Sequence, residues 1–198
     1  MKRISVVIVI ALMLSLDALA LGPWSKSRKM VEGYGHISVT EGVNTSAGAA
    51  LVWGKQHTKG FFLGAGAGLR YAHSVSETED LGGGSRIVYF GDEALLPVFV
   101  RARFGRVRPM KLRPFVTADI GTVINLKPEG NTKGFFFEPQ IGLDLAENVY
   151  VTLGVDTHHF LSRSLIRPSD VIGAVSDPQK KVKDIMTTGV SLHLGYSF

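Results

Sequence analysis

Segments of about ten residues that alternate between apolar and small or polar side chains occur along most of this chain. In the last segment the apolar positions are Val190, Leu192, Leu194, Tyr196 and Phe198. The residues between them are Gly189, Ser191, His193, Gly195 and Ser197. Because successive side chains of a β-strand point to opposite faces, this pattern predicts a strand with one oily face and one small, polar face.

The same alternation returns in several other parts of the chain. It is clear in segments 61–71, 96–104, 135–145 and 149–158, and weaker in segments 31–41, 46–56 and 112–125. Together with the last segment these make eight predicted strands, and single-chain transmembrane barrels have an even number of strands. We find no convincing helix beyond the N-terminal region. The pattern predicts an all-β protein, a transmembrane antiparallel up-and-down barrel of about eight strands.

The polar face of the predicted strands carries glycines together with charges of both signs. The charged positions are Arg70, Arg101, Arg103, Asp119, Glu138, Asp144 and Asp156. A soluble sandwich or a lipocalin-like barrel turns its apolar face inward and its charged face to water. Here the small glycines would leave volume for the arginines, and opposite charges could pair in an enclosed space where an unpaired charge is costly. We therefore expect the oily face to contact lipid and these seven side chains to form a charge network in the lumen.

Connection lengths support a membrane barrel independently. If the mature N-terminus starts in the periplasm, the outer connections lie near 42–45, 74–92, 126–133 and 161–184. The inner connections lie near 57–59, 105–111 and 146–148. The two longest connections thus fall on one side, as expected for a barrel with short periplasmic turns and long extracellular loops. Since about eight strands leave an interior filled by side chains, we expect no open pore.

The N-terminal residues have the pattern of a secretory signal peptide. Lys2 and Arg3 precede an apolar run from residue 4 to residue 16, and Ala18-Leu19-Ala20 follows it. A charged region, a short apolar region and an A-x-A site are the three parts of such a peptide. We predict that residues 1–20 are removed and that residues 21–198 form one barrel domain. The chain has no cysteine, so disulfides and thiolate metal sites are excluded.

The end of the chain resembles the C-terminal strand of outer-membrane barrel proteins. That strand ends in an aromatic residue and is the recognition signal for the barrel assembly machinery. Segments 61–68, 113–116 and 134–139 resemble successive strands of the small porin-like family named "outer membrane protein beta-barrel domain". The resemblance covers nearly the whole mature chain and implies a bacterial outer-membrane location. It also implies that the machinery is a partner during biogenesis and that the assembly signal comprises Val190, Leu192, Leu194, Tyr196 and Phe198.

Two groups of residues are candidates for chemistry. His158 and His193 share the lumen face, but their strand positions separate them by more than about 10 Å, so we interpret them as hydrogen-bonded lumen residues rather than metal ligands. His159, with Ser162 and Ser164 beyond it, is the candidate for a lipid-modifying enzyme. The spacing of the known deacylase motif, a His two residues before a Ser, is absent there.

These observations predict a monomeric, non-enzymatic barrel without a cofactor, whose outer connections carry a recognition or structural role. The expected surroundings are outer-membrane lipid including lipopolysaccharide. Lys180, Lys181 and Lys183 could contact its phosphates, but we favour their interpretation as part of an exposed, charged loop. The net charge of +5 is spread along the chain rather than clustered, so a nucleic-acid partner is not expected. The alternatives are a deacylase-like enzyme and a narrow channel for small solutes.

Overall fold

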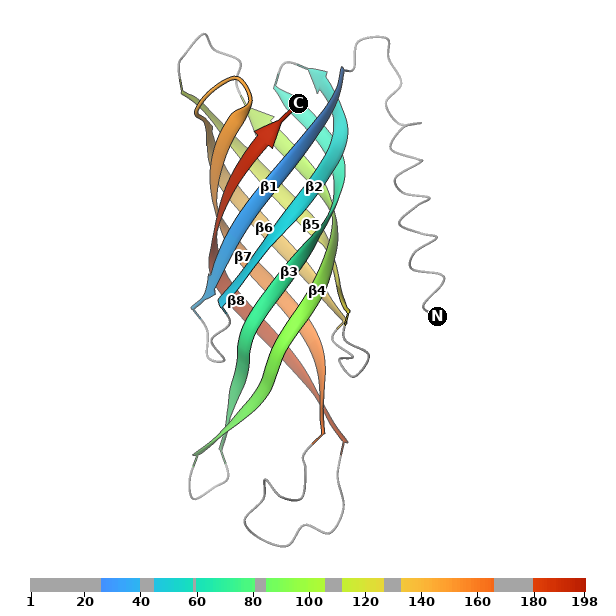
Figure 1. Cartoon of the computed structure of the whole chain (residues 1–198), viewed down its shortest axis with the longest axis vertical. Coiled ribbons are helices and arrows are strands. Elements are labelled where there is room, and N and C mark those ends of the chain that lie inside the picture. The colour runs from blue at the N-terminus through green and yellow to red at the C-terminus, as the bar shows by residue number, and fades with distance from the viewer. Residues whose placement is uncertain are drawn as a thin grey trace, which may run out of the picture.

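The computed structural model describes residues 26–39, 45–58, 60–80, 85–105, 112–126, 133–165 and 180–198. These residues form eight strands that close into one barrel (Figure 1). The strands are β1 (Lys26–Ser38), β2 (Thr45–Thr58), β3 (Phe61–Asp80), β4 (Ser85–Gly105), β5 (Arg113–Asn125), β6 (Lys133–Asp144), β7 (Val149–Leu165) and β8 (Lys180–Ser197). Each strand pairs antiparallel with the next, and β8 pairs with β1. The predicted fold class is confirmed.

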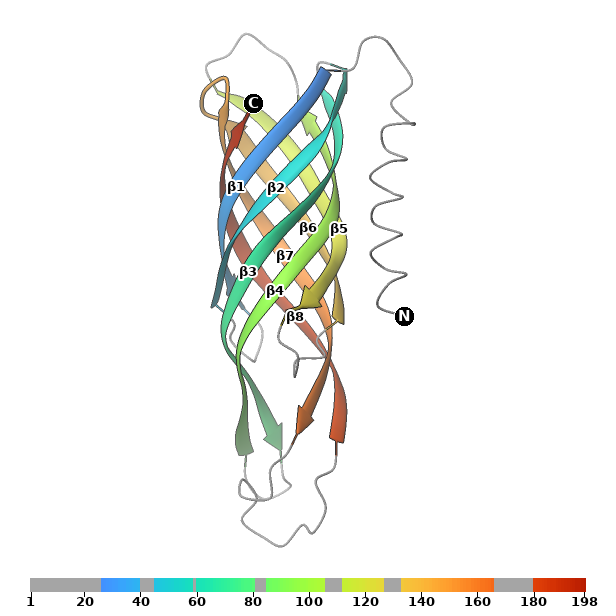
Figure 2. The same ribbon diagram turned by 45° about the vertical axis from the view of Figure 1, so that its right-hand side comes forward.

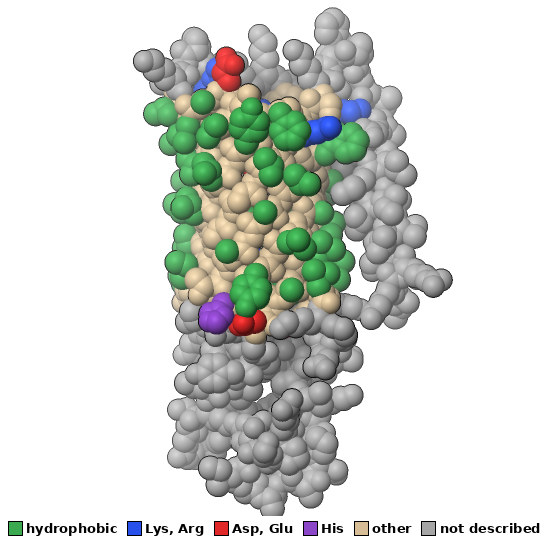
Figure 3. Space-filling model, in the orientation of Figure 1, with side chains coloured by type: hydrophobic (Ala, Val, Ile, Leu, Met, Phe, Trp, Pro, Cys, Tyr) green, Lys and Arg blue, Asp and Glu red, His purple; other side chains and the backbone are tan. Residues whose placement is uncertain are grey.

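The two faces of the strands differ as the alternation predicts. Along β8, Leu192 and Leu194 are 57% and 60% exposed, whereas Ser191 and His193 are 2% and 3% exposed. The apolar side chains form a band around the wall in Figure 3, and the charged side chains visible in that view lie at its two edges. Because the barrel is closed, its strands have no free edge in the hydrocarbon, where an unpaired backbone group is costly.

The two longest predicted connections are largely strand. Strands β3 and β4 stay paired to Asp80 and Ser85, and β7 and β8 stay paired to Leu165 and Lys180. Both hairpins extend from the end of the barrel opposite to the start of β1 (Figure 2). Backbone pairing continues in these hairpins beyond the point where apolar and polar residues stop alternating. Sequence periodicity reports the alternation but not the pairing. The predicted boundaries at 74–92 and 161–184 were therefore wrong.

Some sequence predictions concern residues that the structure does not describe, and others concern residues that lie in a different element from the one predicted. Residues 1–20 lie outside the described part of the chain. Lys180, Lys181 and Lys183 belong to β8 rather than to a loop, and their side chains are not described. The first strand begins at Lys26, five positions before the predicted start at residue 31. Within the described ranges, no helix has the length and apolar character needed to cross a membrane.

Candidate functional site

A buried ion cluster bridges opposite walls of the barrel. Arg101 on β4 donates from Nε to Oδ1 of Asp119 at 2.7 Å and from Nη2 to Oε2 of Glu32 at 2.9 Å. Glu32 lies on β1 and Asp119 on β5, four strands apart in a ring of eight. The Tyr150 hydroxyl also donates to Glu32. Because Arg101 contacts carboxylates on two opposite strands, it forms a strut across the lumen. Arg101 is 2% exposed, and the two carboxylates are its counterions.

A second group of side chains joins this strut. The ring nitrogen Nε2 of His193 lies 2.7 Å from Oε1 of Glu138, and the Ser191 hydroxyl donates to the same oxygen. The other ring nitrogen of His193 lies 3.5 Å from Oε2 of Glu32. Glu138 is on β6 and His193 on β8, so the polar contacts continue around the lumen. Of the carboxylates in the predicted network, Glu138 takes a histidine rather than an arginine as its partner.

A third group lies closer to the long hairpins. Arg70 on β3 donates from Nη1 to Oδ2 of Asp156 on β7 at 2.8 Å and from Nε to the hydroxyl of Ser46 at 2.8 Å. His158 contacts Asp156, and Nε2 of His36 lies 3.5 Å from Oδ2 of Asp156. Strands β3 and β7 are also four apart in the ring, so Arg70 and Asp156 form a second strut across the lumen.

The fourth group lies at the opposite end of the lumen. Nη2 of Arg103 donates to both carboxylate oxygens of Asp144, at 2.6 and 2.7 Å. The guanidinium carbon of Arg103 lies 3.6 Å from the ring centroid of Phe115. The structure thus places all seven charges of the predicted network on the lumen side. Glu138 is linked through His193 to the Arg101 strut, whereas Arg70 and Arg103 have their own counterions, Asp156 and Asp144.

Aromatic rings fill much of the space between these groups, and the lumen glycines make room for them. A Cβ atom at Gly195 would overlap the Tyr150 ring, and one at Gly142 would overlap the Phe115 ring. At Gly66 the nearest atoms are those of the Phe99 ring. Our expectation that glycines leave volume for arginines was therefore wrong at these positions. A flat ring needs the close approach to backbone that only glycine permits.

This contact gives a test of packing in the lumen. Gly195→Ala should lower the free energy of unfolding by about 1–3 kcal/mol, because the added methyl group has to displace the Tyr150 ring. Urea unfolding in lipid vesicles measures the change. Gly33→Ala is the matched control, since a Cβ at Gly33 meets no atom within 4 Å. Equal stability of the two variants would contradict the packing described here.

The two candidate histidines whose side chains the structure describes, His158 and His193, are not brought together. His193 pairs in register with Thr152, and His158 pairs with Thr187, so the two histidines lie at different heights in the lumen. The interpretation of both as hydrogen-bonded lumen residues agrees with their contacts. Strand β7 contains His159, Ser162 and Ser164, but the structure does not describe their side chains. Among the described residues, no group of His, Asp and Glu could hold a metal ion.

Sequence reasoning missed several lumen residues. Glu32, His36 and Tyr150 are 2%, 3% and 1% exposed, yet none was assigned to the network. The sequence contains a weak signal for Glu32 and His36. They are neighbours of the apolar residues Val31 and Ile37, which would face lipid, so they would face the lumen. Gly33 and Gly35 interrupt that oily face, which made the face of β1 uncertain in the sequence.

The proposed assembly residues lie on the outer face of β8. Val190, Tyr196 and Phe198 are exposed, as are the two leucines between them. The backbone of Phe198 both donates to and accepts from Lys29 on β1, at 2.8 and 2.9 Å. The last residue therefore takes part in the seam that closes the barrel.

Comparison with known proteins gives structural similarity alone. Neither the protein-family models nor the curated proteins include a match to this sequence. Neisserial surface protein A aligns with a TM-score of 0.50 and 10% identity, covering 88% of this chain and 99% of that one. The outer membrane protein OprG from Pseudomonas aeruginosa has a TM-score of 0.46 and 10% identity, covering 87% and 95%. The N-terminal β-barrel domain of OprF from the same organism has a TM-score of 0.42 and 15% identity, covering 88% and 99%. Closure, strand number and the similarity to the neisserial protein identify this chain as having the fold of the small eight-stranded outer-membrane β-barrels.

Proposed function

We propose that this protein is a non-enzymatic barrel of the bacterial outer membrane, in which the lumen is structural and the recognition role lies at the long-hairpin end. The observation that carries the proposal is the pair of ion struts inside an apolar wall. Arg101 joins β4 to β1 and β5, and Arg70 joins β3 to β7. Such contacts hold opposite walls at one distance and occupy the space that a solute would need.

The recognition role is assigned to the long-hairpin end because it extends beyond the apolar band. Loops and hairpin ends on a rigid scaffold are the usual carriers of binding. The surrounding lipid, including lipopolysaccharide, is the proposed environment of these hairpins. The outward residues at the end of β8 are the proposed signal for the barrel assembly machinery, and the proposed state of the protein is a monomer.

Single cysteines test this orientation cleanly because the chain has none of its own. Ser85→Cys introduces a cysteine into the first residue of β4, in a long hairpin, and Asn148→Cys introduces one at the opposite end of the barrel. A membrane-impermeant maleimide should label the first variant in intact cells. It should label the second only after the outer membrane has been permeabilised. The reverse result would contradict the proposed orientation.

Conductance in planar lipid bilayers tests the structural role of the lumen. We expect little stable current from the purified protein, because charged and aromatic side chains fill the interior of an eight-stranded barrel. The double variant Arg70→Ala/Asp156→Ala is the matched comparison, since it removes one strut and both of its charges. A stable unit conductance of the unmodified protein would instead favour the narrow-channel function.

A further inference from the structure

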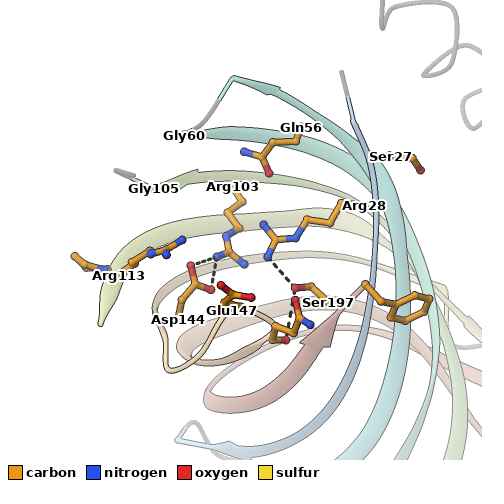
Figure 4. A pocket seen from close by; sticks show the side chains of 13 residues that line it. Ser27, Arg28, Gln56, Gly60, Arg103, Gly105, Arg113, Asp144, Glu147 and Ser197 are labelled. Atoms are coloured by element: carbon orange, nitrogen blue, oxygen red, sulfur yellow. Dashed lines mark hydrogen bonds and ion pairs between the residues drawn. The ribbon is translucent and has the colours of Figure 1, made fainter. Parts of the chain in front are cut away.

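A polar pocket opens at the end of the barrel that carries the start of β1 and the end of β8 (Figure 4). Its volume is about 370 Å³. This lies within the range of about 300–1,000 Å³ that is typical of small-molecule sites. The ionisable side chains that line it are Arg28, Arg103, Arg113, Asp144 and Glu147. The pocket lies away from the long hairpins, so its role is independent of the proposed recognition role.

The positive charges of the three arginines are not equally balanced by carboxylates. Arg103 holds both oxygens of Asp144. Nη2 of Arg28 donates to the uncharged hydroxyl of Ser197 at 2.8 Å, and Arg28 forms no ion pair with the residues that the structure describes. Arg113 likewise forms no ion pair within that part of the chain. Two guanidinium groups therefore line the pocket without a direct counterion.

One donor of Arg103, whose side chain lies beside that of Arg28, is unused as well. Nη1 of Arg103 is buried and has no hydrogen-bond partner among the described residues. The side chains of Arg28 and Arg103 reach from β1 and β4 toward the same part of the pocket (Figure 4). Like charges that approach each other in a partly desolvated place repel, and an unmet donor carries its own cost. An oxyanion bound beside Arg28 would reduce the repulsion and accept a hydrogen bond from Nη1 of Arg103.

The charges of the lining side chains favour a monoanion. Three arginines and two carboxylates carry a formal side-chain charge of 3 − 2 = +1. A dianion would place a second negative charge beside Asp144 and Glu147, and both carboxylates would repel it. A planar carboxylate also matches the guanidinium fork. We propose that this pocket binds a small monoanionic carboxylate, with Arg28 as its principal ligand and with Arg103 and Arg113 beside it.

Titration with acetate, followed by NMR of 15N-arginine-labelled protein, tests the proposal. The full barrel is held in phosphatidylcholine nanodiscs, which contain no lipid carboxylate, and chloride keeps the ionic strength constant. We expect a saturable shift of the Arg28 side-chain signal. Inorganic phosphate, added at a pH where it is a dianion, should bind more weakly than acetate. A lack of saturation by acetate, or tighter binding of phosphate, overturns the proposal.

Variants separate this pocket from a general effect of charge. In Arg28→Gln, read at the Arg103 and Arg113 signals, the affinity for acetate should fall about tenfold or more, as for a lost hydrogen bond between charged groups. Lys29→Gln is the matched control, because it removes the same charge from the next residue, whose side chain is exposed on the other face of β1. It should leave the affinity unchanged. If Arg28→Gln fails to fold, Arg113→Gln takes its place with an expected loss of about threefold. Unchanged affinity in the arginine variant, or an equal loss in Lys29→Gln, overturns the proposal.

Discussion

Arg101→Met should lower the free energy of unfolding by about 3–5 kcal/mol, the cost expected when one partner of a buried ion pair is removed. Glu32 and Asp119 would then remain as buried carboxylates at 2% exposure, without their shared counterion. Reversible urea unfolding in lipid vesicles measures the loss. Tryptophan fluorescence can follow the transition, since Trp53 lies on the lipid-facing side at 60% exposure.

A triple variant is the control for Arg101→Met. Arg101→Met combined with Glu32→Gln and Asp119→Asn removes all three charges, so no buried charge is left unpaired. We expect the triple variant to be more stable than Arg101→Met alone, because neutral amides need less compensation than carboxylates. If the single variant loses less than about 1 kcal/mol, the strut across the lumen does not stabilise the barrel in the way described.

Leu192→Arg should reduce stability by about 2–4 kcal/mol or prevent assembly, because an arginine near the membrane midplane has to leave water. Leu192 lies within the outward apolar run of β8, next to Leu153 and Gly35 in the pairing register. Heat-modifiable migration in gels reports the folded fraction, and urea unfolding reports the free energy.

Leu192→Phe is the matched control for this lipid-facing position. It retains an apolar side chain that hydrocarbon can accommodate, so the folded fraction should stay close to that of the unmodified protein. Equal tolerance of arginine and phenylalanine at position 192 would show that the exposed apolar band does not contact hydrocarbon.

The face of each strand residue could be predicted because successive side chains of a strand point to opposite faces, so apolar and polar residues alternate along the sequence. In β8 the choice between Leu192 and Ser191 is local, and the same holds for Ile141 and Gln140 in β6. The ends of β3, β4, β7 and β8 could not be predicted this way. Their pairing continues through segments without regular alternation, such as residues 74–80 in β3 and the apolar run 87–90 in β4. Backbone hydrogen bonds leave no periodic trace in such a segment.

The partners of the lumen charges depended on information that no single strand contains. Parity places Arg70, Arg101 and Arg103 inside the barrel but does not say which carboxylate each one meets. That choice depends on closure and on the register of all eight strands, which set Arg70 opposite Asp156 and Arg101 between Glu32 and Asp119.

Alternation of oily and polar side chains was sufficient by itself to determine the class of fold, the number of strands and the face that each strand turns to lipid. These properties follow from the two-residue period of an extended chain. The struts across the lumen, the glycines that accept aromatic rings and the arginine pocket at the barrel end were decided by the tertiary structure alone. Each of them joins residues from strands that are distant in the chain, and only the curvature and closure of the sheet bring those residues within contact distance.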